Sequence, residues 1–189
     1  MEMIPEVIAN IKIGVKRTIE ITNGLRLYAR IDKEDKSKYD IHQIIETALL
    51  LLKPRIEKKI DIIKYYSELP LIFVYPGKLS QVFINLLSNA VDSIEERNEL
   101  IEVQSITITT KEDNGKITIQ FSDTGKGIPT EIVDKLFDPF FTTKKVGKGT
   151  GLGLSISLGI IEEHQGKISA KNNIPIGAIF EIEIPIKND

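Results

Sequence analysis

Apolar residues and threonines of the first segment recur at alternating spacings of four and three between residues 4 and 29. This heptad pattern is typical of a helix that packs against other helices, and Pro5 falls in the first turn, where a helix tolerates proline. Because such a stripe needs a partner, the pattern predicts an oligomer or a further helix outside the chain. Residues 32–38 are charged, lack an apolar period and are interpreted as a linker.

The middle of the chain alternates between helical and strand-like patterns. Asp40 and Gln43 have the spacing of a capping box before an amphipathic helix, which Pro54 is expected to kink or shorten. Residues 60–65 and 71–75 are short β-prone runs. Pro76 then begins the clearest helix of the chain. Its apolar residues form one stripe: Leu79, Val82, Phe83, Leu86, Leu87, Ala90, Val91 and Ile94.

Two β-hairpins are predicted in the second half of the chain. Residues 106–110 and 117–121 alternate in polarity around Asn114-Gly115, which is a strong hairpin signal. The later elements are a short helix, a longer helix and the two strands of another hairpin: residues 129–137, 151–164, 168–170 and 178–184. This order predicts an α/β or α+β domain that has a largely antiparallel sheet with helices on one face.

Composition bounds the classes of protein and of partner. A chain of 189 residues that is 41% hydrophobic and 28% charged can form one main domain, expected over residues 39–189, with residues 1–38 as an appendage. The formal net charge of -2 gives no basic field for nucleic acid or anionic lipid. The absence of cysteine excludes thiol chemistry and thiolate zinc sites. No apolar run approaches the ~20 residues of a membrane span, so the chain is expected to be soluble and cytoplasmic.

Three polar residues line one side of the helix that begins at Pro76. Asn85, Asn89 and Asp92 fall at positions i, i+4 and i+7, away from the apolar stripe. Amide and carboxylate oxygens there are suitable ligands for a hard cation such as Mg²⁺. A solvated polar face is the alternative, and the spacing taken alone favours it.

Two glycine segments and the loop between them are candidates for a ligand pocket. Asp123 ends a strand before Gly125 and Gly127, so its carboxylate would accept from an exocyclic amine such as that of adenine; a capped glycine turn is the alternative. Residues 147–154 lead into a helix, so the free amides at its start could bind phosphate oxygens. We favour this interpretation over a flexible linker. Residues 137–145 are aromatic and then basic, which fits either a hinged lid or a hydrophobic loop anchor.

The two histidines are expected to be structural or exposed rather than chemical. His164 lies at a helix end before Gly166 and is expected to be structural. His42 lies near the start of a capped helix, has no acidic residue directly beside it and is expected at the surface.

Taken together and in this order, four segments closely resemble the nucleotide boxes of sensor histidine kinases. They read Gln81-Val-Phe-Ile-Asn-Leu-Leu-Ser-Asn-Ala, Asp123-Thr-Gly-Lys-Gly-Ile, Phe137-Asp-Pro-Phe-Phe-Thr-Thr-Lys and Gly149-Thr-Gly-Leu-Gly-Leu. The resemblance spans roughly residues 39–186, and the third box is similar to that of the nitrogen-regulator type. It implies the Bergerat α/β two-layer sandwich of the gyrase, chaperone, histidine kinase and MutL superfamily, in which Mg-ATP lies between helices and a mobile lid.

The resemblance also implies roles for individual residues. Asn89 would coordinate Mg²⁺ through its amide oxygen, and Asn85 would assist the metal or the phosphates. Asp123 would accept the adenine amine, and Ile128 and Leu152 would line the base pocket. Lys144 or a nearby lysine would neutralise the terminal phosphate, and Lys144 is assigned with Asn85 to catalysis. The implied nucleotide-binding set is Asn85, Asn89, Asp92, Asp123, Gly125, Gly127, Ile128, Phe137, Thr143, Lys144, Gly149, Thr150, Gly151, Leu152 and Gly153.

The chain departs from the wider family at two points. ATP-hydrolysing relatives tend to carry a glutamate general base one helical turn before the metal-binding asparagine, where this chain has Asn85. Without that carboxylate, activation of water is expected to be poor and transfer to another nucleophile is favoured. Many histidine kinases carry a lysine and an aromatic residue where this chain has Asp92 and Ser93, so base stacking is not expected there.

The phosphoacceptor histidine of the family is not matched in this chain. The family carries it in a His-Glu or His-Asp box on the first helix of a dimerising hairpin, and residues 4–29 resemble only the second helix. Neither His42 nor His164 lies in such a box. The resemblance therefore implies a fragment of a homodimeric sensor, which binds Mg-ATP without phosphorylating itself and donates the γ-phosphate to a histidine outside the chain, for a response regulator. A stand-alone serine kinase of the anti-sigma-factor type and a non-catalytic nucleotide-sensing module are the alternatives.

Overall fold

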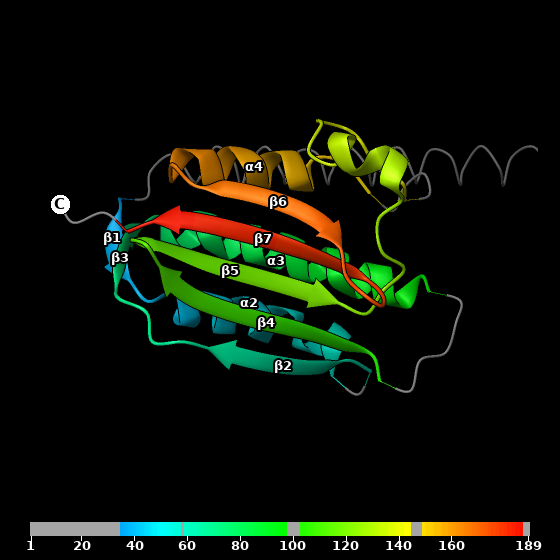
Figure 1. Cartoon of the computed structure of the whole chain (residues 1–189), viewed down its shortest axis with the longest axis horizontal. Helices are drawn as coiled ribbons and strands as arrows, with labels where there is room; N and C mark the ends of the chain where they lie inside the picture. Colours follow the sequence, from blue (N-terminus) through cyan, green and yellow to red (C-terminus); the bar gives the residue numbers. More distant parts are fainter. Residues whose placement is uncertain (1–34, 58, 98–102, 145–148, 187–189) are drawn as a thin grey trace, which may run out of the picture.

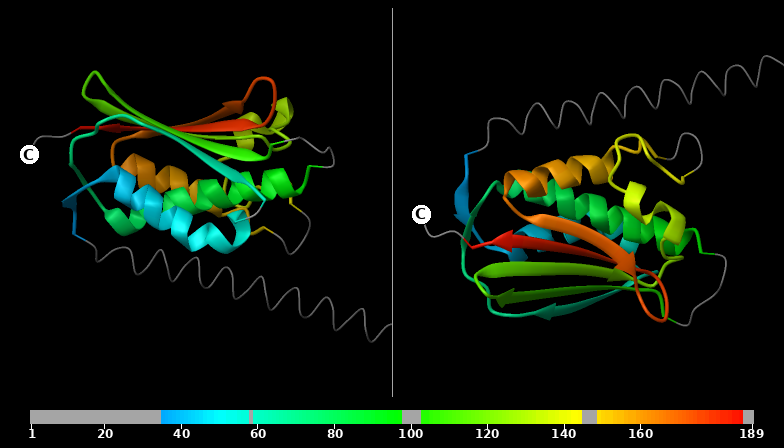
Figure 2. Two further views of the ribbon diagram at one scale, coloured as in Figure 1. Left: turned by 90° about the horizontal axis from the view of Figure 1, so that it is seen from below. Right: turned by 45° about the horizontal axis from the view of Figure 1, so that its top comes forward.

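A sheet and a layer of helices pack face to face in this protein. The computed structural model describes residues 35–57, 59–97, 103–144 and 149–186, so the helix predicted over residues 4–29 lies outside the described residues. Seen edge-on, the helices lie on one face of the sheet (Figure 2). The predicted α/β two-layer sandwich, with a mixed and mostly antiparallel sheet, is confirmed.

The main sheet has five strands in the described part of the chain (Figure 1). Their spatial order is β2 (Asp61–Tyr66), β4 (Ser105–Asp113), β5 (Lys116–Asp123), β7 (Ala178–Pro185) and β6 (Lys167–Asn172). Strand β2 pairs with β4 in parallel, and the other pairs are antiparallel. The turn between β4 and β5 places Asn114 and Gly115 at φ angles of 51° and 73°, so the predicted Asn-Gly hairpin is confirmed.

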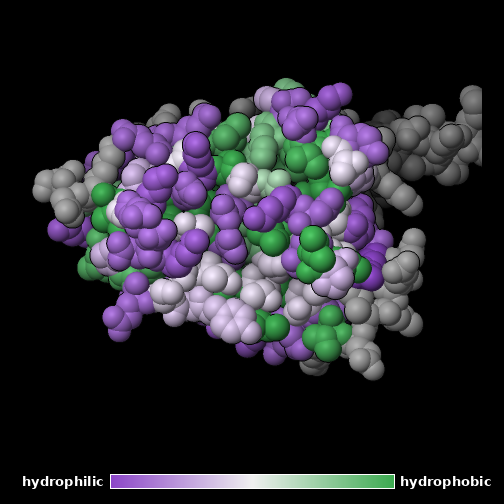
Figure 3. All heavy atoms as spheres, viewed as in Figure 1, coloured by the Kyte–Doolittle hydropathy of each residue, from purple (hydrophilic) through white to green (hydrophobic). Residues whose placement is uncertain are grey.

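Three helices cover one face of this sheet within the described residues: α2 (Ile41–Ile56), α3 (Pro76–Glu95) and α4 (Gly153–Glu163). A short 3₁₀ helix, η1 (Thr130–Lys135), precedes α4. The whole apolar stripe predicted for α3 is buried, and the Phe83 ring packs 5.5 Å from that of Phe121 on β5. Hydrophilic and neutral side chains predominate on the opposite face of the sheet (Figure 3). The core therefore lies between the two layers, where burial of apolar surface stabilises the fold.

Helix α2 begins and ends close to its predicted limits. The Asp40 carboxylate accepts a hydrogen bond of 2.8 Å from the backbone N–H of His42, as expected of an N-cap. Pro54 lies inside the last turn, and the helix ends two residues later at Ile56. None of the helices in the described part of the chain is both long and apolar enough to cross a membrane.

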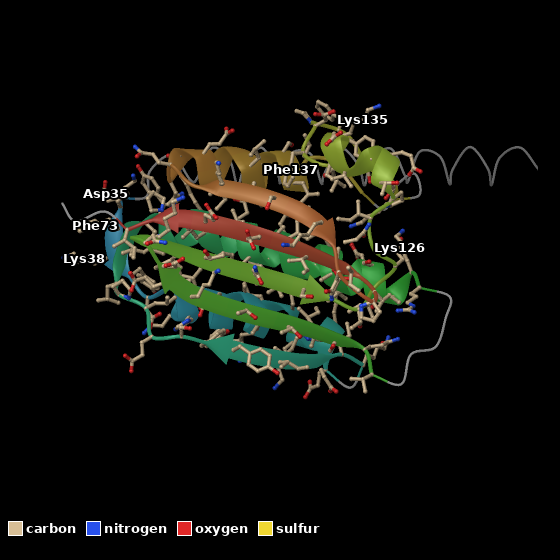
Figure 4. All side chains as sticks on the ribbon, in the orientation of Figure 1. Asp35, Lys38, Phe73, Lys126, Lys135 and Phe137 are labelled. Atoms are coloured by element: carbon tan, nitrogen blue, oxygen red, sulfur yellow. The ribbon has the colours of Figure 1, made fainter. Side chains whose placement is uncertain are left out.

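A second, two-stranded sheet corrects the interpretation of residues 32–38 as a linker. Residues Ser37–Tyr39 form strand β1, which pairs antiparallel with β3 (Ile72–Val74). The Lys38 ammonium lies 5.4 Å from the centre of the Phe73 ring, and the two side chains are neighbours in Figure 4. All three β1 residues are exposed, so this strand leaves no alternation of polar and apolar residues to detect.

The histidines have different environments. His164 is buried, donates from Nδ1 to the Ile160 carbonyl at 2.7 Å and accepts at Nε2 from the Tyr75 backbone N–H at 3.1 Å, so its structural role is confirmed. Burial lowers its pKa, in agreement with this neutral state. His42 is partly buried rather than exposed at the surface: its Nε2 lies 2.9 Å from the Thr110 hydroxyl and its ring stacks on that of Tyr66. The N-cap geometry also places Asp40 Oδ1 3.8 Å from Nδ1.

Candidate functional site

A cavity of about 1010 Å³ opens at one end of the sandwich. It is lined by α3, by the loop that follows β5, by the segment from η1 to Lys144, by the start of α4 and by the loop between β6 and β7. Segments that are far apart in sequence therefore meet around one space. A volume of this size is in the range of pockets that hold a nucleotide-sized ligand.

The exposed side of α3 contributes a pair of oxygens to the cavity. The Lys144 ammonium donates to Asn89 Oδ1 at 3.0 Å and to Asp92 Oδ2. Asn85 is used differently, because its Nδ2 donates to the Gly153 carbonyl at 2.5 Å and thereby holds the first residue of α4. The helix therefore presents a cation-binding pair of oxygens beside an amide that fixes its neighbour α4.

Arg55 of α2 holds Asp92 from its other carboxylate oxygen and was missed by sequence reasoning. Its guanidinium donates to Asp92 Oδ1 at 2.7 Å, to Glu95 Oε2 at 2.8 Å and to the Ser88 hydroxyl at 3.2 Å. Burial alone would raise the pKa of the Asp92 carboxyl, but its bonds with Lys144 and Arg55 outweigh burial and hold that pKa below its usual value. Asp92 is therefore ionised and lies between two cations.

Asp123 provides a buried carboxylate at the end of β5. The residue is 3% exposed, and its Oδ1 accepts from the backbone N–H groups of Gly125 at 2.8 Å and of Ala178 at 3.3 Å. Burial raises its pKa to about 6 although both hydrogen bonds oppose the change. A Cβ on Gly125 would lie 2.2 Å from the Ser93 hydroxyl, so only glycine fits between α3 and this carboxylate.

Asn172 fixes the backbone beside Asp123 and was also missed. Its Oδ1 accepts from the Ile128 N–H at 2.7 Å, and its Nδ2 donates to the Ile128 carbonyl at 2.8 Å. This pair of bonds joins the loop after β5 to the end of β6. The β6–β7 loop adds further cavity residues, among them Asn173, Pro175, Ile176 and Gly177. Their Asn, Pro and Gly content signals only a turn, so no sequence motif marks them as part of a site.

The second glycine segment packs closely against the loop that follows η1. Gly151 has a φ of +68°, and a Cβ there would lie 2.3 Å from the carbonyl carbon of Phe140. A side chain at this position would therefore be strained and would also clash with backbone. Gly153 opens α4 against Asn85, so the N-terminus of this helix faces the cavity. Free amides at a helix N-terminus favour anionic groups.

Most of the residues proposed from sequence line the cavity together. Those that do are Asn85, Asn89, Asp92, Asp123, Gly127, Ile128, Thr143, Lys144, Gly149, Thr150, Gly151 and Gly153. Gly125 is not among the lining residues, but its backbone N–H donates to Asp123 Oδ1. Phe137 packs partly buried against the core on the α4 side of η1 (Figure 4). Leu152 is the N-cap residue of α4, and Leu154 lines the cavity in its place.

Solved structures of known class share this arrangement. The catalytic domain of the histidine kinase ThkA superposes with a TM-score of 0.70 at 34% identity, over 80% of this chain and 96% of that one. The structure of ThkA in complex with the response regulator TrrA gives a TM-score of 0.68 at 31% identity, over 90% of this chain and 49% of that one. The fold is therefore that of a histidine kinase catalytic domain.

Sequence comparison gives the same classification. Residues 75–188 match the model of the histidine kinase-, DNA gyrase B- and HSP90-like ATPase family, and the chain belongs to this family. It is 30% identical over 188 residues to the sensor kinase CckA of Brucella abortus, covering 94% of this chain and 20% of that protein. It is 31% identical over 158 residues to the sensory histidine kinase/phosphatase NtrB of Proteus hauseri, covering 80% and 44%. The resemblance to sensor histidine kinases, the nitrogen-regulator type included, is confirmed, and the chain spans less than half of these relatives.

Proposed function

We propose that this chain binds ATP with a magnesium ion in the cavity and supplies the γ-phosphate to a histidine outside the chain. One observation carries the proposal: a buried carboxylate, Asp123, and a cation-binding pair of oxygens, on Asn89 and Asp92, line the same cavity. Such a cavity offers an acceptor for a base amine and a cation position for a polyphosphate.

The Asp123 end of the cavity suits adenine. Its described hydrogen bonds both end on Oδ1, so Oδ2 is the oxygen that would accept from the exocyclic amine. An ionised carboxylate would repel the carbonyl oxygen that guanine has at the corresponding position. Ile128 and Leu154 supply apolar surface in the same cavity. We therefore expect selectivity for adenine nucleotides.

The α3 end of the cavity suits a magnesium ion. An ammonium already lies between Asn89 Oδ1 and Asp92 Oδ2, so these side chains are arranged around a cation. Oxygens are also the ligands that Mg²⁺ prefers, so the donors fit this ion. Mg²⁺ would neutralise phosphate charge when bound, and the amides from Gly149 to the start of α4 would hold phosphate oxygens.

The carboxylates of the cavity favour phosphoryl transfer over hydrolysis of ATP. Among the described residues, those that line it are Asp92, Glu96 and Asp123. Asp92 is paired with Lys144 and Arg55, and Glu96 accepts from Lys126 at 2.6 Å. Asp123 accepts two backbone N–H bonds. A carboxylate paired with a cation, as in Asp92 and Glu96, is a poor general base for water. Asp123 would be occupied by the base amine, and the amide of Asn85 cannot accept a proton.

The relatives suggest the histidine acceptor and the response regulator that would receive the phosphate. ThkA has been captured with the response regulator TrrA, and we propose that phosphate passes from the external histidine to such a regulator. We assign residues 39–189 to the catalytic unit and extend it to Ser37, because β1 pairs with β3. The preceding residues, with the heptad pattern of residues 4–29, are assigned to part of a dimerising segment in a homodimeric sensor.

Calorimetric titration of the chain with ATP, with and without Mg²⁺, tests the binding proposal. Asp123→Asn removes the charged acceptor and Asn89→Ala removes a metal ligand, so each should weaken Mg-ATP binding by at least about tenfold. Asp113→Asn, at the exposed end of β4, is the matched control and should bind as the wild type does. Unchanged affinity in both site variants would contradict the assignment.

Transfer needs a separate assay with a supplied acceptor. The chain is mixed with γ-labelled ATP and a separately made helical hairpin that carries a histidine. Label on the hairpin that is lost in acid and kept in alkali identifies phosphohistidine and supports the proposal. Acid-stable label would point to a serine kinase. Absence of transfer by a chain that binds Mg-ATP would favour a nucleotide-sensing module.

A further inference from the structure

The Lys144 ammonium occupies a position that a metal ion would need. It donates to Asn89 Oδ1 at 3.0 Å and to Asp92 Oδ2, which are one turn apart on α3. About three quarters of the Lys144 side chain is removed from solvent, at 23% exposure, and that of Asp92 is 25% exposed. The contact is therefore a partly buried ion pair with a second oxygen, which solvent screens less than a surface pair.

Lys144 and a divalent cation cannot share these oxygens. Mg²⁺ binds oxygen ligands at about 2.0–2.1 Å, and an ammonium held by the same two atoms would lie within a few ångströms of it. Two cations at that separation repel strongly in a partly buried site. Occupancy by Lys144 and occupancy by metal are therefore mutually exclusive at Asn89 Oδ1.

Arg55 makes the exchange of one cation for another feasible. Its guanidinium stays on Asp92 Oδ1, on Glu95 and on Ser88, and these contacts do not involve Lys144. Asp92 therefore keeps its orientation and one positive partner while Oδ2 changes partners. Because a cation lies on Oδ2 before and after the exchange, Asp92 is not left with an uncompensated charge, which would be costly in a partly buried site.

We propose that Lys144 is an internal counter-ion of the metal position, and that the magnesium ion which arrives with ATP displaces it from Asn89 and Asp92. This inference rests on the proposed function. The displaced ammonium would then be free to pair with the triphosphate, which would lie in the cavity that Lys144 lines. One lysine thus serves two anionic partners in turn. In the nucleotide-free protein it also lowers the affinity of the site for metal alone.

Metal binding without nucleotide tests this exchange directly. Mn²⁺ alone is titrated into the full chain, and free Mn²⁺ is measured by electron paramagnetic resonance. Lys144→Gln removes the competing charge, so Mn²⁺ should bind at least about fivefold more tightly than to the wild type. Lys144→Arg keeps a cation and should match the wild type. Lys135→Gln, an exposed lysine of η1, is the matched control and should also match it.

The tighter Mn²⁺ binding expected of Lys144→Gln must depend on the oxygens of Asn89 and Asp92. Adding Asn89→Ala to Lys144→Gln should therefore abolish the tighter Mn²⁺ binding. Equal Mn²⁺ affinity of Lys144→Gln and wild type, or a gain that survives Asn89→Ala, would overturn the exchange. Calorimetry with ATP on the same samples separates the two proposals: a wild-type chain that does not bind ATP refutes the proposed function, whereas ATP binding with unaltered Mn²⁺ affinity in Lys144→Gln refutes the exchange alone.

Discussion

Asp123→Asn should make the nucleotide-free protein more stable while it weakens binding of ATP. The wild-type carboxyl is buried and has its pKa raised from 3.8 to about 6. A carboxyl whose pKa is higher in the folded than in the unfolded protein favours the folded state when protonated. The free energy of unfolding therefore falls as the pH rises from about 3.8 through about 6, and the loss is complete above that range.

The size of this loss follows from the interval between the two pKa values. At about 1.36 kcal/mol per pH unit, the interval from 3.8 to about 6 corresponds to about 3 kcal/mol at pH 7.5. At pH 5, where the carboxyl is mostly protonated in the folded protein, the loss is about half as large. Asparagine has nearly the same shape and can still accept from Gly125 and Ala178 through its oxygen.

Urea unfolding at pH 5 and pH 7.5 measures this effect. The free energy of unfolding of Asp123→Asn is expected to exceed that of the wild type by up to about 3 kcal/mol at pH 7.5 and by about half as much at pH 5. The exposed Asp113→Asn control should show no comparable difference between the two pH values. If Asp123→Asn and wild type unfold with equal free energies at both pH values, the reasoning from burial is wrong.

Three further variants test the packing around the site. Gly151→Ala forces a side chain into a positive φ and against Phe140, so it should lower the free energy of unfolding by more than about 2 kcal/mol in a denaturant titration. Phe83→Ala empties the centre of the core and should cost about 3–5 kcal/mol in the same assay; a value below about 1 kcal/mol would contradict its placement. Asn172→Ala removes two hydrogen bonds to Ile128 and should cost about 1–3 kcal/mol and weaken ATP binding; unchanged values of both would show that this contact is dispensable.

Elements encoded by neighbouring residues were predicted well from the sequence. Helix α3 begins at Pro76 and buries its whole stripe, and the β4–β5 hairpin turns at Asn114-Gly115. In both cases the signal lies within one element: a repeat of 3.6 residues, a proline at the first helical position, or a dipeptide that adopts positive φ. The polar side of α3 follows from the same repeat, which is why Asn89 and Asp92 were expected side by side.

Features that depend on distant residues were not predictable in this way. Arg55 reaches α3 from the end of α2, and Asn172 reaches Ile128 from the end of β6; neither lies in a motif. The hydrogen bond from Asn85 to the Gly153 carbonyl depends on how α4 packs against α3, and no sequence periodicity encodes that packing. Strand β1 is exposed throughout and so lacks the alternation that reveals a strand. Tertiary contact, rather than local preference, decides all of these positions.

Tyr75 lies where β3, α3 and the end of α4 meet, at the start of the helix that carries Asn89. It is the single residue between β3 and α3, its N–H is bonded to His164 at the end of α4, and its ring lies 4.5 Å from the Lys78 ammonium and 5.2 Å from that of Lys36, next to β1. Asn89 is fourteen residues further along a rigid helix, about 21 Å away at 1.5 Å per residue. A change of about 5° in the direction of α3 at Tyr75 would therefore move Asn89, and with it the proposed metal position, by about 2 Å.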